Sequence, residues 1–166
     1  GVHYGMPVKM ARQLCSEAIC IRGDMELYTR YSGLVTDIVS EAAPVYEKAS
    51  IDEHYIDITG MDRFFGCLRW SNELRQRIVR ETGLPVSLGL SVNKTVSKIA
   101  TGEAKPNGLM NVPLPVVHPF LHPLSIRKIP MLGPQTFRLL RSMGIVTIGM
   151  LSQIPPEMMI RVLGQN

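Results

Sequence analysis

Two adjacent carboxylates, Asp52 and Glu53, interrupt a stretch of the chain that otherwise has the composition of β-strands. Residues 45–59 are rich in β-branched, aromatic and aliphatic side chains, and Gly60 ends the run. Because successive side chains of a strand point to opposite faces, the two acids can reach one site only at a hairpin end or a bend. We therefore expect two short strands joined at the acid pair.

The acid pair can be interpreted in two ways. Mg²⁺ is a hard cation that proteins usually hold with one or two carboxylates together with substrate phosphates and water. Two such ions can clamp an in-line phosphoryl displacement, so Asp52 and Glu53 are candidate Mg²⁺ ligands. A pair of solvated acids at a turn is the alternative, and from the dipeptide alone it is the better explanation.

Composition places the chain among ordinary globular proteins. Its 166 residues suffice for one domain or slightly more, and 45% hydrophobic residues are enough for a core. The net charge of +4 permits a polyanionic partner without requiring one. Apolar runs are too short for a membrane span, and no signal peptide is recognisable.

The cysteines and the chain ends add two expectations. Cys15, Cys20 and Cys67 lack zinc-type spacing, so we expect free thiols and a cytoplasmic location. The chain begins at Gly1 rather than at a methionine, and its last helical pattern has no stop signal. We therefore expect a piece of a longer protein.

Hydrophobic periodicity predicts alternating helices and strands up to residue 112. Asp24 and Asn93 are expected to cap helices, and Gly83 to end one. The expected helices span residues 8–14, 25–42, 62–82 and 94–103, and further strands span 86–92 and 109–112. This order favours an α+β fold of ferredoxin-like plan, with two helices on one face of a mostly antiparallel sheet.

The sequence changes character after Pro113, where prolines become frequent and no further strand is predicted. Short helices are expected over residues 135–143, 147–154 and 156–163. We therefore place a domain boundary near residue 113 and expect a small all-helical unit after it.

Four stretches of the chain occur together in a fixed order. They are Gly5-Met6-Pro7 followed by Leu14-Cys15, Ser50 to Asp57, Val92-Asn93-Lys94 continued by Ala104 to Gly108, and Ile129 to Gly133 continued by Met143-Gly144-Ile145. Together they resemble the Y-family, or translesion, DNA polymerases, and among these most nearly the bacterial subgroup. The resemblance covers nearly the whole chain, and four motifs in series are far more specific than one.

The resemblance implies three parts, namely a remnant of the fingers domain over 1–24, a catalytic palm over 25–112 and a helix-hairpin-helix thumb over 113–166. It also implies that a further metal-binding Asp, a sugar-gate aromatic and a triphosphate clamp lie before Gly1, and that a DNA-gripping domain follows Asn166. Alone, the fragment is expected to be inactive, to bind DNA weakly and to self-associate through an unpaired sheet edge.

The implied reaction is template-directed DNA synthesis across damaged DNA, in which two Mg²⁺ ions assist nucleotidyl transfer. By this resemblance Asp52 and Glu53 are the catalytic metal ligands, and Lys105 reaches the phosphates of the incoming deoxynucleoside triphosphate. A solvated turn lysine is the alternative for Lys105. The implied partners are primer–template DNA and deoxynucleoside triphosphates, with a sliding clamp as a further partner of the intact protein.

The resemblance also implies contacts with DNA. Lys94 and Lys98 lie four residues apart on one helix face, and backbone N–H groups where the helix of residues 135–143 begins can bind phosphate. For the two lysines, a solvated helix face explains the spacing equally well. The complete expected set is Lys94, Lys98, Leu132, Gly133 and Thr136.

Two departures from the family pattern and two other functions stay open. His54 adjoins the acids where the family usually has Ala, and it can perturb them. Met131 stands where the hairpin usually has a Gly, which would let the backbone approach a phosphate more closely. A nucleotidyl cyclase-type enzyme on a similar palm, or a non-catalytic DNA-binding fragment, also fits the acids and lysines.

Overall fold

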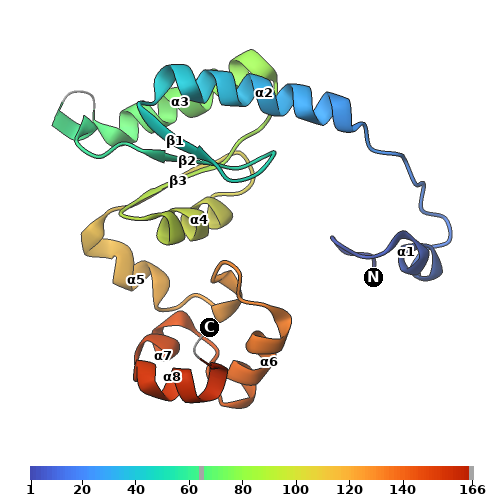
Figure 1. The fold of residues 1–166 in the computed structure, drawn as a ribbon, viewed down its shortest axis with the longest axis vertical. Coiled ribbons are helices and arrows are strands. Elements are labelled where there is room, and N and C mark those ends of the chain that lie inside the picture. The colour runs from blue at the N-terminus through green and yellow to red at the C-terminus, as the bar shows by residue number, and fades with distance from the viewer. Residues whose placement is uncertain (64–65, 165–166) are drawn as a thin grey trace.

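The computed structural model describes residues 1–63 and 66–164 and has a mixed α/β architecture (Figure 1). Its elements follow the order predicted up to residue 112. The helices are α1 Val8–Leu14, α2 Met25–Ala42, α3 Cys67–Thr82, α4 Lys94–Glu103, α5 Val117–Leu121, α6 Pro134–Ser142, α7 Ile148–Ser152 and α8 Pro156–Leu163. The strands are β1 Val45–Lys48, β2 His54–Asp57, β3 Leu88–Ser91 and β4 Leu109–Val112. Short 3₁₀ segments are η1 Met61–Arg63, η2 Leu114–Val116 and η3 Ile126–Lys128.

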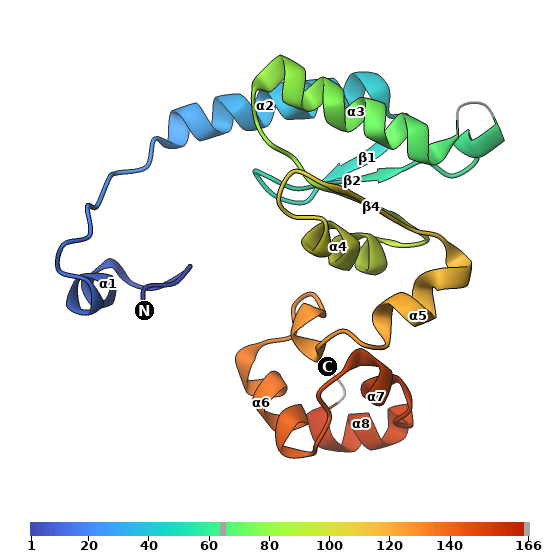
Figure 2. The ribbon, with the colours of Figure 1, turned by 180° about the vertical axis from the view of Figure 1, so that it is seen from behind.

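Helices α2 and α3 lie together on one side of the strands, as Figure 1 and Figure 2 show from opposite directions. Val39 of α2 and Leu74 and Ile78 of α3 are buried in one apolar cluster. Each such side chain contributes about 1.5–3 kcal/mol when it is fully buried, so this contact holds the pair of helices. Asp24 begins α2 by accepting a hydrogen bond from the Leu27 N–H at 2.9 Å, as predicted.

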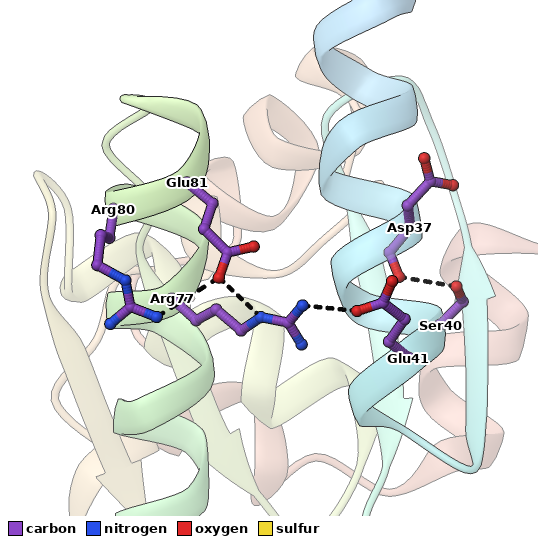
Figure 3. Close-up of polar contacts among 6 residues, drawn as sticks. All are labelled: Asp37, Ser40, Glu41, Arg77, Arg80 and Glu81. Carbon is purple, nitrogen blue, oxygen red and sulfur yellow. Dashed lines mark hydrogen bonds and ion pairs between the residues drawn. The ribbon is translucent and has the colours of Figure 1, made fainter.

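One ion pair joins α3 to α2, and two more lie within α3 beside it (Figure 3). Arg77 donates to Glu41 of α2 at 2.6 Å and to Glu81 of its own helix at 3.0 Å. Arg80 adds a longer contact of 3.4 Å to Glu81. Exposed ion pairs contribute about 0–1 kcal/mol, so the apolar cluster beneath them decides how the helices pack.

The helix predicted over residues 62–82 begins later than expected, at Cys67. Gly66 precedes it with a φ of +71°, a left-handed conformation that interrupts the helical path. Asp62 accepts a hydrogen bond from the Cys67 N–H at 2.9 Å, so it stabilises the start of the helix from outside. Phe64 and Phe65, which the prediction included in this helix, lie outside the described residues. Gly83 ends the helix in the left-handed conformation, as predicted.

The strands form two pairs. β1 and β2 are antiparallel, with Val45 opposite Asp57 and Lys48 opposite His54. β3 and β4 are parallel, with Leu88 aligned to Leu109. The prediction of a mostly antiparallel sheet is therefore wrong for the second pair. The reason is the connection, because β3 and β4 are joined through α4, and a helical crossover returns the chain in the same direction.

Helix α4 lies on the other side of the strands from α2 and α3 (Figure 1 and Figure 2). Asn93 begins it by accepting a hydrogen bond from the Val96 N–H at 3.0 Å, as predicted. Its backbone comes unusually close to β3, because a Cβ at Gly89 would lie 2.2 Å from the Ser97 carbonyl oxygen and 2.5 Å from the Thr101 nitrogen. Only glycine permits this approach, so Gly89 determines where α4 lies.

Two apolar clusters organise the chain beyond β3. The first joins Val96 and Ala100 of α4 and Val112 of β4 to side chains of α5. This cluster therefore extends past residue 113, where the sequence suggested a boundary. The second joins Ile126, Leu140 and Ile145 and is bordered by side chains of α7 and α8. The predicted C-terminal helices are present, with α7 shorter than expected.

The N-terminal arm, residues 1–24, extends away from the packed elements (Figure 1). Helix α1 has no buried residue, and the side chains of Val8, Met10 and Leu14 are exposed. The three cysteines are free thiols, as predicted. Within residues 1–63 and 66–164, no helix combines the length and the apolar character that a membrane crossing requires.

Candidate active site

Asp52 and Glu53 lie in the connection between β1 and β2, which is the position that their strand-breaking character predicted. The backbone N–H groups of Ala49 and Ser50 both donate to the Glu53 carbonyl oxygen, at 2.9 and 3.3 Å. The Ser50 hydroxyl donates to the Asp52 carboxylate at 2.7 Å. The connection is thus a closed turn that presents Asp52 to solvent and leaves Glu53 half-buried.

Helix α4 supplies a lysine to this turn. The Lys98 ammonium donates to both carboxylate oxygens of Glu53, each at 2.5 Å. Lys94, one turn earlier, pairs with Glu47 of β1. The two lysines therefore share a helix face, as predicted, and that face points at the hairpin.

Tyr55 connects the two lysine–glutamate pairs. It lies in β2, two residues after Glu53 of the turn, and its register partner in β1 is Glu47. Its hydroxyl group acts to lower the pKa of Glu53, and the Lys94 ammonium lies 5.4 Å from the centre of its ring. Sequence reasoning missed Tyr55, although the two-residue spacing from Glu53 was a usable signal.

The charges around Glu53 favour its ionised form. The hydrogen bond from Lys98 lowers the pKa of Glu53, assisted by the hydrogen bond from Tyr55, while burial and the charge of Asp52 oppose this shift. Conversely, the hydrogen bond to Glu53 raises the pKa of Lys98. Burial, together with the hydrogen bond to Glu53, raises the pKa of Tyr55. At neutral pH the turn therefore holds a carboxylate and an ammonium in direct contact.

His54 points to α2. Its Nε2 lies 3.0 Å from the Thr36 hydroxyl oxygen, and Lys48 donates to the same oxygen at 3.0 Å. Burial, followed by the charge of Lys48, lowers the pKa of His54. At neutral pH the imidazole is therefore uncharged and linked to α2. The residues that act on the pKa of Glu53 are Lys98, Tyr55 and Asp52, and an effect of His54 on the acids stays a prediction.

Lys105 lies in the turn between α4 and β4, with an exposed side chain. Arg75 of α3 donates to the carbonyl oxygen of Asn107 at 3.0 Å and to its side-chain oxygen at 2.9 Å. A Cβ at Gly108 would lie 2.3 Å from the Ala104 carbonyl oxygen, so the turn closes tightly on the end of α4. No hydrogen bond or ion pair joins Lys105 to the acid pair in the part of the chain that the structure describes.

The turn before α6 carries the other candidate DNA contacts. Gly133 immediately precedes the helix, and Leu132 packs against the C-terminal cluster. Thr136 lies in the first turn of the helix and is half-buried. Met131 has a φ of +63° and a fully exposed side chain. This left-handed conformation favours glycine, which is the residue that the family pattern has there.

Two contacts near this turn had no sequence signal. The Arg127 guanidinium lies 4.3 Å from the centre of the Phe137 ring. Lys128 forms an ion pair of 2.7 Å with Glu103 at the end of α4, without the alignment of a hydrogen bond. These contacts fix η3 against α6 and against α4.

Asp52 and Glu53 are candidate ligands for a metal ion. Among residues 1–63 and 66–164, no group of three or more His, Cys, Asp or Glu side chains is placed to hold a metal ion. Asp52 and Glu53 offer hard carboxylate oxygens, the ligand type that Mg²⁺ prefers, and Mg²⁺ commonly takes its other ligands from phosphates and water. The Lys98 ammonium shows that a cation can reach both oxygens of Glu53. The residues present therefore fit a Mg²⁺ site that is completed by other ligands.

Comparison with known proteins gives consistent matches over the whole chain. The impB/mucB/samB family matches residues 1–102. The DNA polymerase IV of Dehalococcoides mccartyi strain BAV1 is 38% identical over 165 residues, which cover 99% of this chain and 42% of the relative. The DNA polymerase IV of Exiguobacterium sibiricum is 34% identical over 167 residues, which cover 100% of this chain and 46% of the relative. The chain thus spans less than half the length of these relatives.

Solved structures agree with the sequence matches. DinB from Sulfolobus solfataricus superposes with a TM-score of 0.87 at 28% identity, over 99% of this chain and 49% of the other. An insertion ternary complex of Dbh DNA polymerase superposes with a TM-score of 0.84 at 28% identity, over 99% of this chain and 48% of the other. The chain therefore matches about half the length of each of these two structures.

Proposed function

Because the chain belongs to the impB/mucB/samB family, that is, to the Y-family DNA polymerases, we propose that the whole protein synthesises DNA on a template and across damaged bases. The observation that carries the proposal is the acid pair in a closed hairpin turn, where a cation from another element reaches Glu53. The relatives are named DNA polymerases, which favours this function over a cyclase-type enzyme.

Within this function the chain comprises three parts. Residues 1–24 belong to the fingers domain, residues 25–112 form a ferredoxin-like palm, and residues 113–166 form a helix-hairpin-helix thumb. The separate C-terminal cluster of Ile126, Leu140 and Ile145 supports the thumb assignment. One apolar cluster joins α4 and β4 of the proposed palm to α5 of the proposed thumb.

Asp52 and Glu53 are the proposed ligands of the Mg²⁺ ions that assist nucleotidyl transfer. When bound, Mg²⁺ lowers the pKa of the primer 3′-hydroxyl and neutralises charge on the triphosphate. The chain itself contributes two carboxylates on a turn whose backbone is fixed, because the N–H groups of Ala49 and Ser50 donate to the Glu53 carbonyl oxygen. Such preorganisation lowers the cost of placing the reactants.

The acid pair is tested in the whole protein by primer extension. Asp52→Ala and Glu53→Ala should each lower the extension rate by about a hundredfold or more, while DNA affinity stays nearly unchanged. Glu47→Ala is the matched control, because it removes a carboxylate from the same hairpin that also pairs with a lysine of α4. Its rate should stay within a few-fold of wild type.

Rates within a few-fold of wild type for both acid variants would refute the assignment. DNA binding that is independent of Mg²⁺, with no nucleotide incorporation by the whole protein, would instead support the non-catalytic alternative. Steady-state primer extension on an undamaged template measures DNA synthesis in general, and extension on a damaged template measures synthesis across the damaged base.

Lys105 is the proposed phosphate ligand for the incoming nucleotide. Its exposed ammonium stands on a turn that Arg75 and Gly108 fix, so a phosphate can meet it without reordering the backbone. Lys105→Ala should raise KM for the nucleotide and lower kcat. Lys105→Arg keeps the charge, so its KM and kcat should lie between those of Lys105→Ala and wild type. A change in DNA affinity alone would make Lys105 a DNA contact instead.

Lys94, Lys98, Leu132, Gly133 and Thr136 are the proposed DNA contacts. The first turn of α6 offers unpaired backbone N–H groups, which suit a phosphate oxygen. Such contacts position a duplex without reading its sequence. Lys94→Ala should therefore weaken binding equally on unrelated sequences and reduce its salt dependence.

A further inference from the structure

The two lysine–glutamate pairs between α4 and the hairpin differ in geometry. Lys98 binds both oxygens of Glu53, whereas Lys94 binds one oxygen of Glu47. The side chains of Lys98 and Glu53 are 41% and 32% exposed, compared with 61% and 57% for Lys94 and Glu47. The pair at the acid turn is therefore the more shielded and the more completely formed.

The backbone holds Lys98 at this place. Its neighbours Val96 and Ala100 are buried against β4 and α5, and the contact of the α4 backbone with Gly89 fixes the helix on β3. Glu53 is fixed in turn by the hydrogen bonds of its carbonyl oxygen. Lys98 therefore meets Glu53 because both backbones are anchored independently, and not because two mobile side chains happen to touch.

An ammonium on both oxygens of Glu53 occupies the place that a divalent cation would take. We propose that Lys98 is an internal counter-ion that holds Glu53 before a divalent cation binds, and that it must leave Glu53 when the cation arrives. Two cations on one carboxylate repel each other, so the exchange sets the affinity of the acid turn for metal. The inference rests on the proposed function only for the assignment of Glu53 as a metal ligand.

The exchange gives Lys98 a second state. Once displaced, its ammonium stays within one side-chain length of the acid turn, where a phosphate group can serve as its counter-ion. The same lysine thus neutralises Glu53 in the free protein and is released towards phosphate when metal is bound. Lys94 has no such exchange, because Glu47 lies outside the acid turn.

Direct Mn²⁺ binding by the 166-residue chain, followed by electron paramagnetic resonance, tests the exchange. Lys98→Met should bind Mn²⁺ about threefold to tenfold more tightly than wild type, because its competitor is gone. Lys94→Met makes the same change in net charge on the same helix face, and its affinity should change less than about twofold. The double variant Lys98→Met, Glu53→Gln should lose the increase in Mn²⁺ affinity that Lys98→Met alone shows. Circular dichroism checks that each variant is folded.

A second readout follows Lys98 itself. Adding Mn²⁺ to the wild-type chain should increase the rate at which acetic anhydride labels Lys98, measured by mass spectrometry, and leave Lys94 unchanged. The inference is overturned if Lys98→Met binds Mn²⁺ no more tightly than wild type. It is also overturned if the labelling rate of Lys98 does not change when Mn²⁺ is added. Failure of the proposed function would give a different result. In that case the Glu53→Ala variant of the whole protein would still extend a primer, whereas failure of the inference would leave the Mn²⁺ affinity of Lys98→Met unchanged.

Discussion

The hairpin that carries Asp52 and Glu53 and the turn that carries Lys105 are fixed in different ways. In the hairpin, the functional carboxylate of Glu53 itself is bound, because Lys98 reaches it from α4. In the Lys105 turn, Arg75 binds the backbone and the side chain of Asn107, and the lysine side chain is exposed. The first region therefore presents a carboxylate already paired with an ammonium, and the second presents an exposed lysine.

This difference indicates how each region would meet a ligand. A cation has to displace Lys98 from Glu53, whereas a phosphate meets Lys105 directly. Both arrangements depend on a glycine that lets α4 come close to another segment, Gly89 beside the middle of the helix and Gly108 beside its end. Substitution of these glycines therefore separates the two regions experimentally.

Gly89→Ala should have the largest effect. Its Cβ would lie 2.2, 2.5 and 2.8 Å from atoms of Ser97 and Thr101, so α4 would have to move away from β3. We expect a loss of about 3 kcal/mol or more in the free energy of unfolding, measured by urea denaturation. Gly102→Ala is the control within α4, because a Cβ there meets open space. It should stabilise the helix by up to about 1 kcal/mol. Equal effects would mean that the β3 contact does not position α4.

Gly108→Ala should have a smaller effect, confined to the second region. Its Cβ would lie 2.3 Å from the Ala104 carbonyl oxygen, with its other neighbours at 3.3 Å or more, so a local shift of the turn can relieve the contact. We expect a loss of about 2 kcal/mol in the free energy of unfolding, with Mn²⁺ binding at Glu53 retained. Gly133→Ala, where a Cβ meets nothing within 4 Å, should change stability by less than about 0.5 kcal/mol. Loss of Mn²⁺ binding in Gly108→Ala would show that the two regions are coupled.

The same two regions show what the sequence could predict. The caps Asp24 and Asn93 act on N–H groups three residues away, so they follow from local pattern. The acid turn likewise follows from the strand-breaking character of its residues. The Lys98–Glu53 pair joins residues 45 positions apart, and it depends on how closely α4 approaches β3. Such a long-range choice of partner leaves no periodic signal. The parallel pairing of β3 with β4, in contrast, follows from the helical crossover through α4, which the predicted order of elements already contained.

Arg75→Ala should loosen the Lys105 turn with an intermediate effect. The substitution removes both hydrogen bonds to Asn107, which join positions 32 residues apart, and leaves that carbonyl oxygen to water. We expect a loss of about 1–1.5 kcal/mol in the free energy of unfolding. Arg69→Ala, on the same helix, removes an exposed pair with Glu73 and should cost less than about 0.5 kcal/mol. A cost for Arg75→Ala as small as that of the control would show that Gly108 and the β4 pairing alone hold the turn.

The smallest effect concerns the pH dependence of the Lys98–Glu53 pair. Lys98 lowers the pKa of Glu53 below its ordinary value of 4.5, so the pair stabilises the folded state above that value and this contribution is lost as pH falls through the lowered pKa. Since Glu53 also raises the pKa of Lys98, the contribution is lost again only at strongly alkaline pH. Lys98→Met should therefore lower the free energy of unfolding by less than about 1 kcal/mol at pH 7, and by almost nothing near pH 3. Urea denaturation of both chains across this range measures the difference. A difference that persists at acid pH would mean that the aliphatic part of Lys98, and not its charge, stabilises the contact with the hairpin.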